Sequence, residues 1–161
     1  MSMILLFQPM NEENARFVLS WRYEAPYDIY NPDSDDVSED LKIFLDPKNA
    51  YYSMTDEQGN VVAYCCFGPE ARVKGGDYRS DALDVGMGLR PDLTGKGNGL
   101  SYVKAVIDFG RRTFSPSAMR VTVAAFNTRA LRVCEKAGFE VKHVFRREDD
   151  GERFVVLERM M

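Results

Sequence analysis

The sequence predicts one domain of mixed α/β or α+β class, and three observations support this prediction. The 161 residues are 45% hydrophobic and 12% aromatic, which is enough to bury one sizeable core. Strand-like and helix-like apolar periodicities alternate along the chain. No repeat, low-complexity tract or linker interrupts this alternation, so we expect a single domain over residues 1–161.

The first half of the chain is predicted to contain a strand, two helices and a hairpin. Residues 3–7 form an apolar run typical of a strand, and residues 11–21 place apolar side chains on one helical face. The acid-rich segment 32–40 precedes LKIFL and indicates the start of a second, short helix. Two β-rich runs then flank residues 57–60, which predicts a hairpin.

Residues 82–89, ALDVGMGL, predict a strand with one apolar face and one almost bare face. The bare face carries Asp84, Gly86 and Gly88. A helix is expected to begin directly after this strand and its glycine-rich turn, because apolar residues then recur at helical spacing.

The remaining segments predict a strand over residues 118–125 and a helix that ends at Gly138. Two further β-rich runs flank residues 149–151, so the chain is expected to close with a β-hairpin.

Composition narrows the class of protein and of partner. The three cysteines are odd in number and no metal-ligand spacing surrounds His143, so we expect free thiols and no metal site. A formal charge of -4 argues against nucleic acid as a partner. No stretch has the roughly 20 apolar residues of a membrane-spanning helix, and no signal peptide is evident. We therefore expect a cytoplasmic protein that does not bind a membrane.

A cluster of glycines, TGKGNG at residues 94–99, lies immediately before the predicted helix. A Walker loop requires GxxxxGK[ST], but Arg90 stands where its first glycine should be and Gly97 where Ser or Thr should be. The GxGxxG patterns of this region also lack their last glycine. A glycine-rich helix N-terminus predicts an anion-binding cradle, with Lys96 and Arg90 adding positive charge. A glycine-rich turn without a ligand is the open alternative.

Two motifs carry a resemblance to a known family. Residues 94–99 resemble the Q/R-x-x-G-x-G/A signature of the GNAT superfamily of acyl-coenzyme A N-acetyltransferases, with Thr94 in place of the first Gln or Arg. Residues 127–131 and 135–139 resemble that superfamily's N-x-x-A…EKxGF helix. The resemblance implies a GNAT-like α+β fold, with a strongly twisted mixed sheet of six or seven strands flanked by about four helices.

The resemblance implies acetyl-coenzyme A (acetyl-CoA) as cofactor. The backbone near Gly88 would pair with the pantetheine arm, and the glycine cradle would hold the pyrophosphate. Asn127 would contact the pantetheine arm, although an ordinary helix N-cap would explain it equally well. The implied cofactor-binding residues are Met87, Gly88, Leu89, Thr94, Gly95, Lys96, Gly97, Asn98, Gly99, Leu100, Asn127 and Ala130.

Two residues are candidates for catalysis. Asp84 stands where some relatives carry a general base, and a salt-bridged structural carboxylate is the alternative. Cys134 stands where many relatives have a tyrosine thought to protonate the departing thiolate, and a small packing residue is the alternative. We expect direct attack of the amine in a ternary complex, because neither Cys65 nor Cys66 has a histidine at a recognisable catalytic spacing.

The acceptor is predicted less narrowly than the cofactor. Trp21, Tyr27 and Tyr30 lie in the region that varies in such proteins and lines the acceptor side, and aromatic packing is their alternative role. The acid-rich segment 32–40 favours a cationic amine, on a small molecule or a peptide. A homodimer is compatible with the sequence. A domain that binds acyl-CoA as a sensor or docking module, without transfer, is the alternative function.

Overall fold

The computed structural model describes residues 3–161, which form two compact units. The first unit runs to Cys66 and includes residues 87–94, and the second comprises residues 67–86 and 95–161. The helices are α1 (Glu12–Leu19), α2 (Ser38–Leu45), α3 (Gly99–Phe114) and α4 (Thr128–Lys136). The strands are β1 (Leu6–Pro9), β2 (Tyr51–Thr55), β3 (Val61–Phe67), β4 (Leu83–Leu89), β5 (Ala118–Ala124), β6 (Glu140–Arg146) and β7 (Arg153–Met160).

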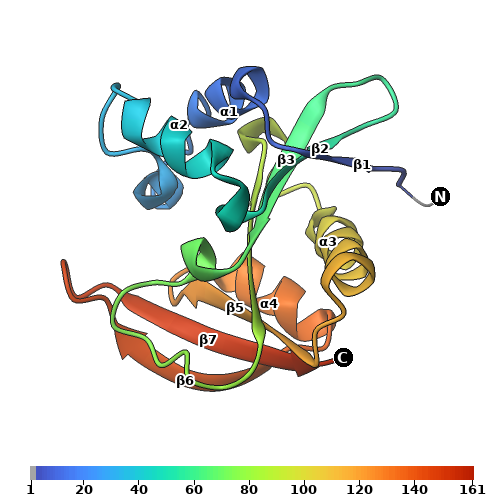
Figure 1. Ribbon diagram of the computed structural model, residues 1–161. Coiled ribbons are helices and arrows are strands. Elements are labelled where there is room, and N and C mark those ends of the chain that lie inside the picture. Colours follow the sequence, from blue (N-terminus) through green and yellow to red (C-terminus); the bar gives the residue numbers. More distant parts are fainter. Residues whose placement is uncertain (1–2) are drawn as a thin grey trace. The chain divides into compact units, whose positions relative to one another are not determined.

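The seven strands form one mixed sheet in the order β1-β2-β3-β4-β5-β7-β6 (Figure 1). Strands β4 and β5 are parallel, whereas β1 with β2, β2 with β3, β5 with β7 and β6 with β7 are antiparallel. This sheet and the four helices of the described residues confirm the predicted fold class.

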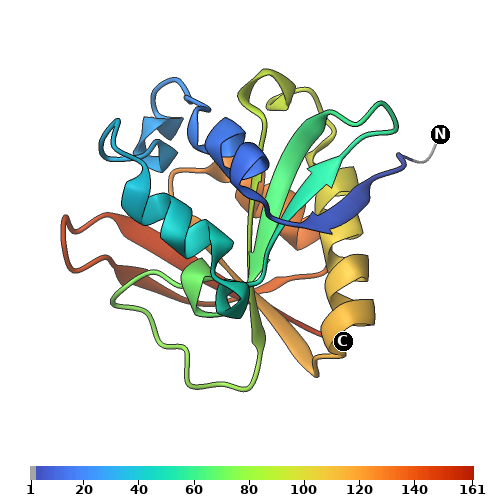
Figure 2. The ribbon, with the colours of Figure 1, turned by 45° about the horizontal axis from the view of Figure 1, so that its top comes forward.

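Helix α1 begins where the sequence places good capping chemistry. The Asn11 side chain accepts a hydrogen bond of 2.8 Å from the Asn14 N–H, and Glu12 and Glu13 lie at the positive end of the helix dipole. Helices α1 and α2 lie side by side against the strands of the first unit (Figure 2). Their shared core consists of Met10, Ala15, Val18, Leu19, Trp21, Leu41 and Val61.

Strand β1 begins later than the sequence predicts. The apolar run starts at Met3, but the strand starts at Leu6, which lies opposite Thr55, the last residue of β2. Residues 3–5 have no partner strand to pair with in this register, so hydrophobicity alone does not make them a strand.

Position 88 of β4 has no room for a side chain, because the ring of Tyr64 on β3 lies against it. A Cβ at position 88 would lie 2.3 Å from Tyr64 Cε1 and 2.9 Å from the Tyr64 hydroxyl oxygen. Tyr64 in turn packs against Trp21, Phe44 and Tyr51. The bare strand face that the sequence shows at this position is therefore filled by an aromatic ring.

We expect Gly88→Ala to lower the free energy of unfolding by about 1–3 kcal/mol, because the new methyl group overpacks the Tyr64 site. Chemical denaturation of both proteins measures the difference. An unchanged midpoint would mean that the Tyr64 ring moves aside without cost, and would contradict the prediction.

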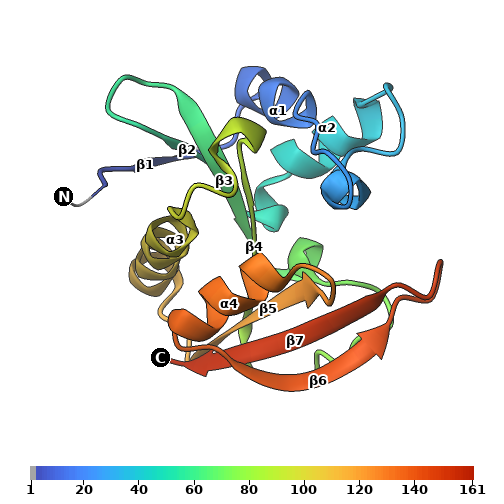
Figure 3. The same cartoon turned by 180° about the vertical axis from the view of Figure 1, so that it is seen from behind.

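The second unit packs its two helices together on one side of β5 and β7 (Figure 3). The fully buried side chains Met119, Val156 and Leu157 supply the strand part of this core. Cys134 of α4 and the C-cap residue Ala137 are also buried. Gly138 has φ 97° and ends α4, as the sequence predicts. Among the described residues, no helix combines the length and apolarity needed to cross a membrane.

Candidate active site

The glycine-rich turn leads directly into α3 and leaves backbone donors available. Gly95 and Gly97 have φ values of 71° and 81°, a region that glycine adopts without strain. Asn98 is the N-cap residue, but its side chain makes no capping hydrogen bond. Within residues 3–161, the N–H groups of residues 95–99 donate no hydrogen bond to another protein group. This helix start therefore has the donors and the dipole that an anion requires.

The three glycines of the turn have different surroundings. A Cβ at Gly97 would meet nothing within 4 Å, so this position is open to a ligand. A Cβ at Gly99 would lie 3.3 Å from Val133 Cγ2, so Gly99 allows close packing of α3 on α4. A Cβ at Gly95 would lie 2.5 Å from a guanidinium nitrogen of Arg129.

Arg129 is the cation that the sequence analysis missed. Its guanidinium lies against Gly95, and it belongs to the first turn of α4. The predicted cation Arg90 instead forms an ion pair of 2.6 Å with Asp92. Lys96 is exposed and lies between Gly95 and Gly97. A single arginine in the first turn of a helix leaves no periodic pattern in the sequence. The contact between Arg129 and Gly95 is therefore visible only in the folded structure.

Two residues of the family motifs have local structural roles. The Asn127 side-chain oxygen accepts a hydrogen bond of 3.1 Å from the Ala130 N–H and caps α4, which is the alternative that the sequence left open. The Thr94 hydroxyl donates to the Pro91 carbonyl oxygen at 2.7 Å. Contacts of Asn127, Ala130 and Thr94 with a cofactor remain predictions.

In the first unit, the carbonyl oxygen of Leu89 is already engaged. The Tyr23 hydroxyl donates to it at 2.7 Å, and burial raises the pKa of Tyr23 to about 12, so the phenol remains a donor at neutral pH. The Tyr23 N–H donates to the Asn31 side-chain oxygen at 2.7 Å, and the Asn31 side-chain amide donates to the Tyr23 carbonyl oxygen at 3.1 Å. These two hydrogen bonds fix the backbone of Tyr23. Any strand-like pairing of a ligand with residues 87–89 would have to share this carbonyl or use their other backbone groups.

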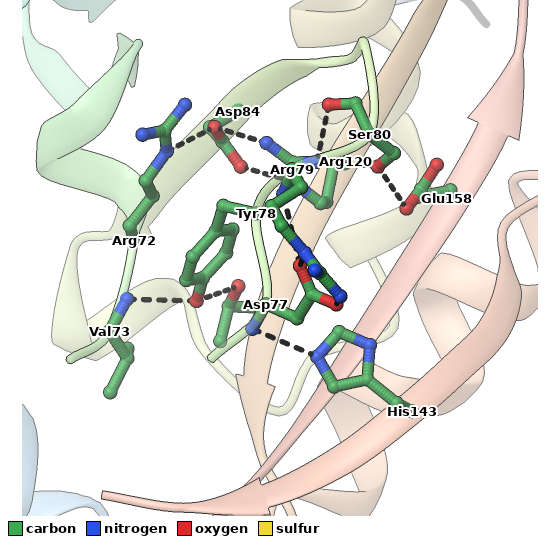
Figure 4. A network of polar contacts seen from close by, with 11 residues as sticks. Arg72, Val73, Asp77, Tyr78, Arg79, Ser80, Asp84, Arg120, His143 and Glu158 are labelled. Atoms are coloured by element: carbon green, nitrogen blue, oxygen red, sulfur yellow. Dashed lines mark hydrogen bonds and ion pairs between the residues drawn. The ribbon is translucent and has the colours of Figure 1, made fainter. Parts of the chain in front are cut away.

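Asp84 forms a buried ion pair in the second unit. Its Oδ1 accepts a hydrogen bond of 2.7 Å from Arg120 Nε, and its Oδ2 accepts from Arg120 Nη2 at 2.8 Å and Arg72 Nε at 2.7 Å. The Asp84 side chain is 3% exposed and that of Arg120 is 0% exposed. Figure 4 shows the two guanidinium groups reaching the carboxylate from different sides. Both oxygens are occupied, which supports the structural alternative for Asp84.

Tyr78 completes this network. Its ring lies 5.4 Å from the Arg72 guanidinium and 5.0 Å from that of Arg120. Its hydroxyl oxygen accepts a hydrogen bond from the Val73 N–H at 2.9 Å, and the hydroxyl shares a second hydrogen bond of 2.9 Å with the Thr122 hydroxyl (Figure 4). Hydrogen bonding to Asp84 raises the pKa of Arg120, so the guanidinium stays charged. The loop before β4 is thereby fixed to β4 and β5.

The three cysteines are free and buried. Burial raises the pKa of Cys134 to about 11 and also raises the pKa of Cys65. Both thiols therefore hold their protons at neutral pH, which disfavours a covalent thiolate nucleophile. Cys134 can still donate a proton, and its catalytic role remains a prediction. Among the described residues, no three His, Cys, Asp or Glu side chains group together as a metal site.

The aromatic residues predicted for the acceptor differ in their surroundings. Trp21 is 7% exposed and belongs to the core of the first unit, which fits the alternative role of aromatic packing. Tyr30 is 43% exposed and meets the Tyr23 ring edge-on, with ring centroids 6.4 Å apart. Tyr27 is half-buried. The acids of segment 32–40 are mostly exposed; Asp35 lies 3.9 Å from Arg22.

Comparisons with known proteins identify the family of the chain. A family model described as an acetyltransferase (GNAT) domain matches residues 5–140. The chain therefore belongs to the GNAT acetyltransferase family. A comparison with curated protein sequences finds no significant match.

Solved structures share the fold at low sequence identity. One is a chimera of the spermidine N-acetyltransferase SpeG from Vibrio cholerae and hSSAT, with TM-score 0.75 and 17% identity over 97% of this chain and 95% of that chain. Another is a GNAT-family acetyltransferase from Bacillus anthracis, with TM-score 0.73 and 16% identity over 99% of this chain and 96% of that one.

Proposed function

We propose that this chain transfers an acetyl group from acetyl-CoA to an amine by direct attack in a ternary complex. The observation that carries the proposal is the α3 N-terminus, where unpaired N–H groups surround a glycine with open space at its Cβ position. A pyrophosphate fits this chemistry because it needs several donors and close approach of the backbone. Arg129 and Lys96 add the positive charge that two phosphate groups require.

Acetyl-CoA would supply the activated acyl carbon and the thiol leaving group. The N–H groups of residues 95–99 would bind and orient its pyrophosphate, and Asn127 would remain the cap that positions α4. Cys134 would hold a proton on Sγ, since its pKa of about 11 keeps the thiol neutral. With both Asp84 oxygens occupied, we assign the amine's proton to water or to the amine's own equilibrium.

The acceptor is proposed to be a cationic amine. Exposed carboxylates of segment 32–40, namely Asp33, Asp35, Asp36 and Glu39, place negative charge in the same unit as Tyr27 and Tyr30. Such a field raises the local concentration of cations. The spermidine N-acetyltransferase among the structures with this fold is consistent with a polyamine-like acceptor.

Two measurements test the proposal. Acetyl-CoA should raise the Tm, whereas ATP with Mg²⁺ should raise it much less, because the turn lacks the Walker residues. Release of free coenzyme A should then be measured with acetyl-CoA and a panel of amines. The panel includes spermidine, a monoamine with no other charged group, and a lysine peptide. Equal or stronger stabilisation by ATP would overturn the assignment of the cradle.

A binding module without transferase activity is the second candidate. It is favoured by the ion pairs of Asp84, which leave no obvious base on β4. Acetyl-CoA that stabilises the fold, but is never consumed with any amine of the panel, would identify this role.

For Cys134→Ala we expect kcat to fall by less than about tenfold, because water can supply the proton to a thiolate leaving group. The matched control is Cys66→Ala, which removes another buried thiol. If kcat falls a hundredfold in Cys134→Ala alone, the thiol is the proton donor and water cannot replace it.

A further inference from the structure

The aromatic cluster of the first unit contains a buried hydrogen-bond donor that the fold does not use. Within residues 3–161, Trp21 Nε1 is the one buried side-chain nitrogen or oxygen without a hydrogen-bond partner. The residue is 7% exposed. An indole N–H can only donate, and it usually finds an acceptor when the ring is buried. Packing therefore explains the position of the Trp21 ring but not its unpaired nitrogen.

The surroundings of Trp21 are poorly suited to a bound water. A buried water typically makes about three hydrogen bonds. The side chains that share the buried core with Trp21 supply none, because they are Met10, Ala15, Val18, Leu19, Leu41 and Val61. The Phe17 and Tyr64 rings that contact the indole are weak hydrogen-bond acceptors at most. A ligand that brings its own oxygen would satisfy this donor better than water.

Tyr64 carries a second unpaired donor beside Trp21. The centroids of the two rings lie 6.1 Å apart. Within the described part of the chain, the Tyr64 hydroxyl makes no hydrogen bond. Burial raises the pKa of Tyr64, so the hydroxyl keeps its proton at neutral pH. Phe44 and Tyr51 also pack on the ring, with centroid distances of 5.8 Å and 6.3 Å, and hold it in place.

The Tyr64 hydroxyl lies against β4. A Cβ at Gly88 would be 2.9 Å from its oxygen. Trp21, Tyr64 and Gly88 all belong to the first unit, which also contains the exposed carboxylates of segment 32–40. This negative charge attracts a cationic ligand and repels an anionic one.

We propose that the Trp21 indole N–H and the Tyr64 hydroxyl bind the carbonyl oxygen of an amine that also carries a neutral amide. A carbonyl oxygen has two lone pairs and accepts two hydrogen bonds, which matches the two donors. A carboxylate would be repelled by segment 32–40, and a protonated polyamine nitrogen has no lone pair to offer. The inference rests on the proposed function, and it narrows the cationic acceptor to one with an amide carbonyl.

The ligand would reach the indole by displacing the Phe17 ring. This ring packs edge-on against Trp21, with centroids 5.7 Å apart, and Phe17 is 44% exposed. Exposed side chains change rotamer within picoseconds to nanoseconds. No change in the backbone is therefore needed for access.

Trp21 is the single tryptophan of the chain, so a ¹H–¹⁵N spectrum of the protein contains one indole N–H signal. The probe is N-(5-aminopentyl)acetamide. Its control is octylamine, a chain of equal length without the carbonyl. We expect the probe to move the indole signal downfield, because the N–H gains a hydrogen bond, and octylamine to cause no such shift. Calorimetry measures the Kd of both amines.

Tyr64→Phe removes the hydroxyl and keeps the ring. Its Tm should not fall, because the hydroxyl has no protein partner to lose. The variant should bind the probe at least about tenfold more weakly and octylamine with unchanged affinity. The matched control is Tyr52→Phe. Ser53 lies opposite Tyr64, so its neighbour Tyr52 is on the other face of the sheet, and this variant should bind the probe as the wild type does.

An indole signal that the probe does not move, or equal probe affinity in the wild type and Tyr64→Phe, would overturn the proposal. A downfield shift caused by acetyl-CoA but not by coenzyme A would assign the two donors to the thioester carbonyl, and would overturn it as well. None of these measurements requires turnover. A probe that binds as expected but is never acetylated would support this site and contradict the proposed transferase activity.

Discussion

Asp84→Asn is expected to lower the free energy of unfolding by about 3–5 kcal/mol, which corresponds to a Tm decrease of roughly 6–20 °C. The variant leaves the Arg120 guanidinium charged and 0% exposed without its carboxylate. The other hydrogen-bond acceptors that the structure gives Arg120 are the neutral carbonyl and hydroxyl oxygens of Ser80, and the Glu158 carboxylate acts on the guanidinium only through space. Thermal and chemical denaturation measure the loss.

Two further variants separate burial from charge. Asp77→Asn removes a carboxylate from the same loop, but its ion pair with Arg79 is exposed, so the Tm should change little. Replacing both partners, as Asp84→Leu with Arg120→Met, should cost less than the sum of the single variants, because no buried charge is left unpaired. Additive losses would mean that the ion pair itself contributes nothing to stability.

Turnover of the folded Asp84→Asn enzyme distinguishes the two roles of this residue. We expect kcat to change by less than about tenfold, because the carboxylate already accepts three hydrogen bonds. A decrease of about a hundredfold or more, with a changed pH profile, would identify Asp84 as the general base despite its ion pairs.

The order of helices and strands was predictable because each has its own periodicity. The helix after the glycine turn begins at Gly99, and the hairpins form around the turn residues that predict them. The short 3-10 helices at residues 27–30, 47–49, 69–71 and 91–93 were not predicted. One turn of helix buries no continuous stripe, so it leaves no periodic pattern in the sequence.

The side chains that a residue contacts were much harder to predict than the helix or strand in which it lies. The sequence places Asp84 on a strand, but Arg72 and Arg120 lie 12 and 36 positions away from it. Likewise, the missing side chain at Gly88 resembles an opening for a ligand, whereas the Tyr64 ring occupies that space. Side-chain packing between distant segments decides both cases, and no local pattern reports it.

Gly97→Glu is expected to weaken acetyl-CoA binding at least about a hundredfold, because a carboxylate in the cradle repels the pyrophosphate at short range. The new Cβ meets no protein atom within 4 Å, so the substitution creates no clash. Its φ of 81° does carry strain for a non-glycine residue, about 1–2 kcal/mol. Calorimetric titration with acetyl-CoA measures the loss of affinity.

Two controls isolate the charge from the strain. Gly97→Gln has the same backbone strain and nearly the same shape without the charge, so it should retain much more of the affinity than Gly97→Glu. Gly59→Glu adds a carboxylate at a matched position, with φ 85° and nothing within 4 Å, in the hairpin between β2 and β3. It should have a similar cost in Tm and unchanged acetyl-CoA affinity. If Gly97→Glu binds acetyl-CoA as tightly as Gly59→Glu does, the pyrophosphate lies elsewhere, because salt does not screen the repulsion between two charges at contact distance, well inside the Debye length.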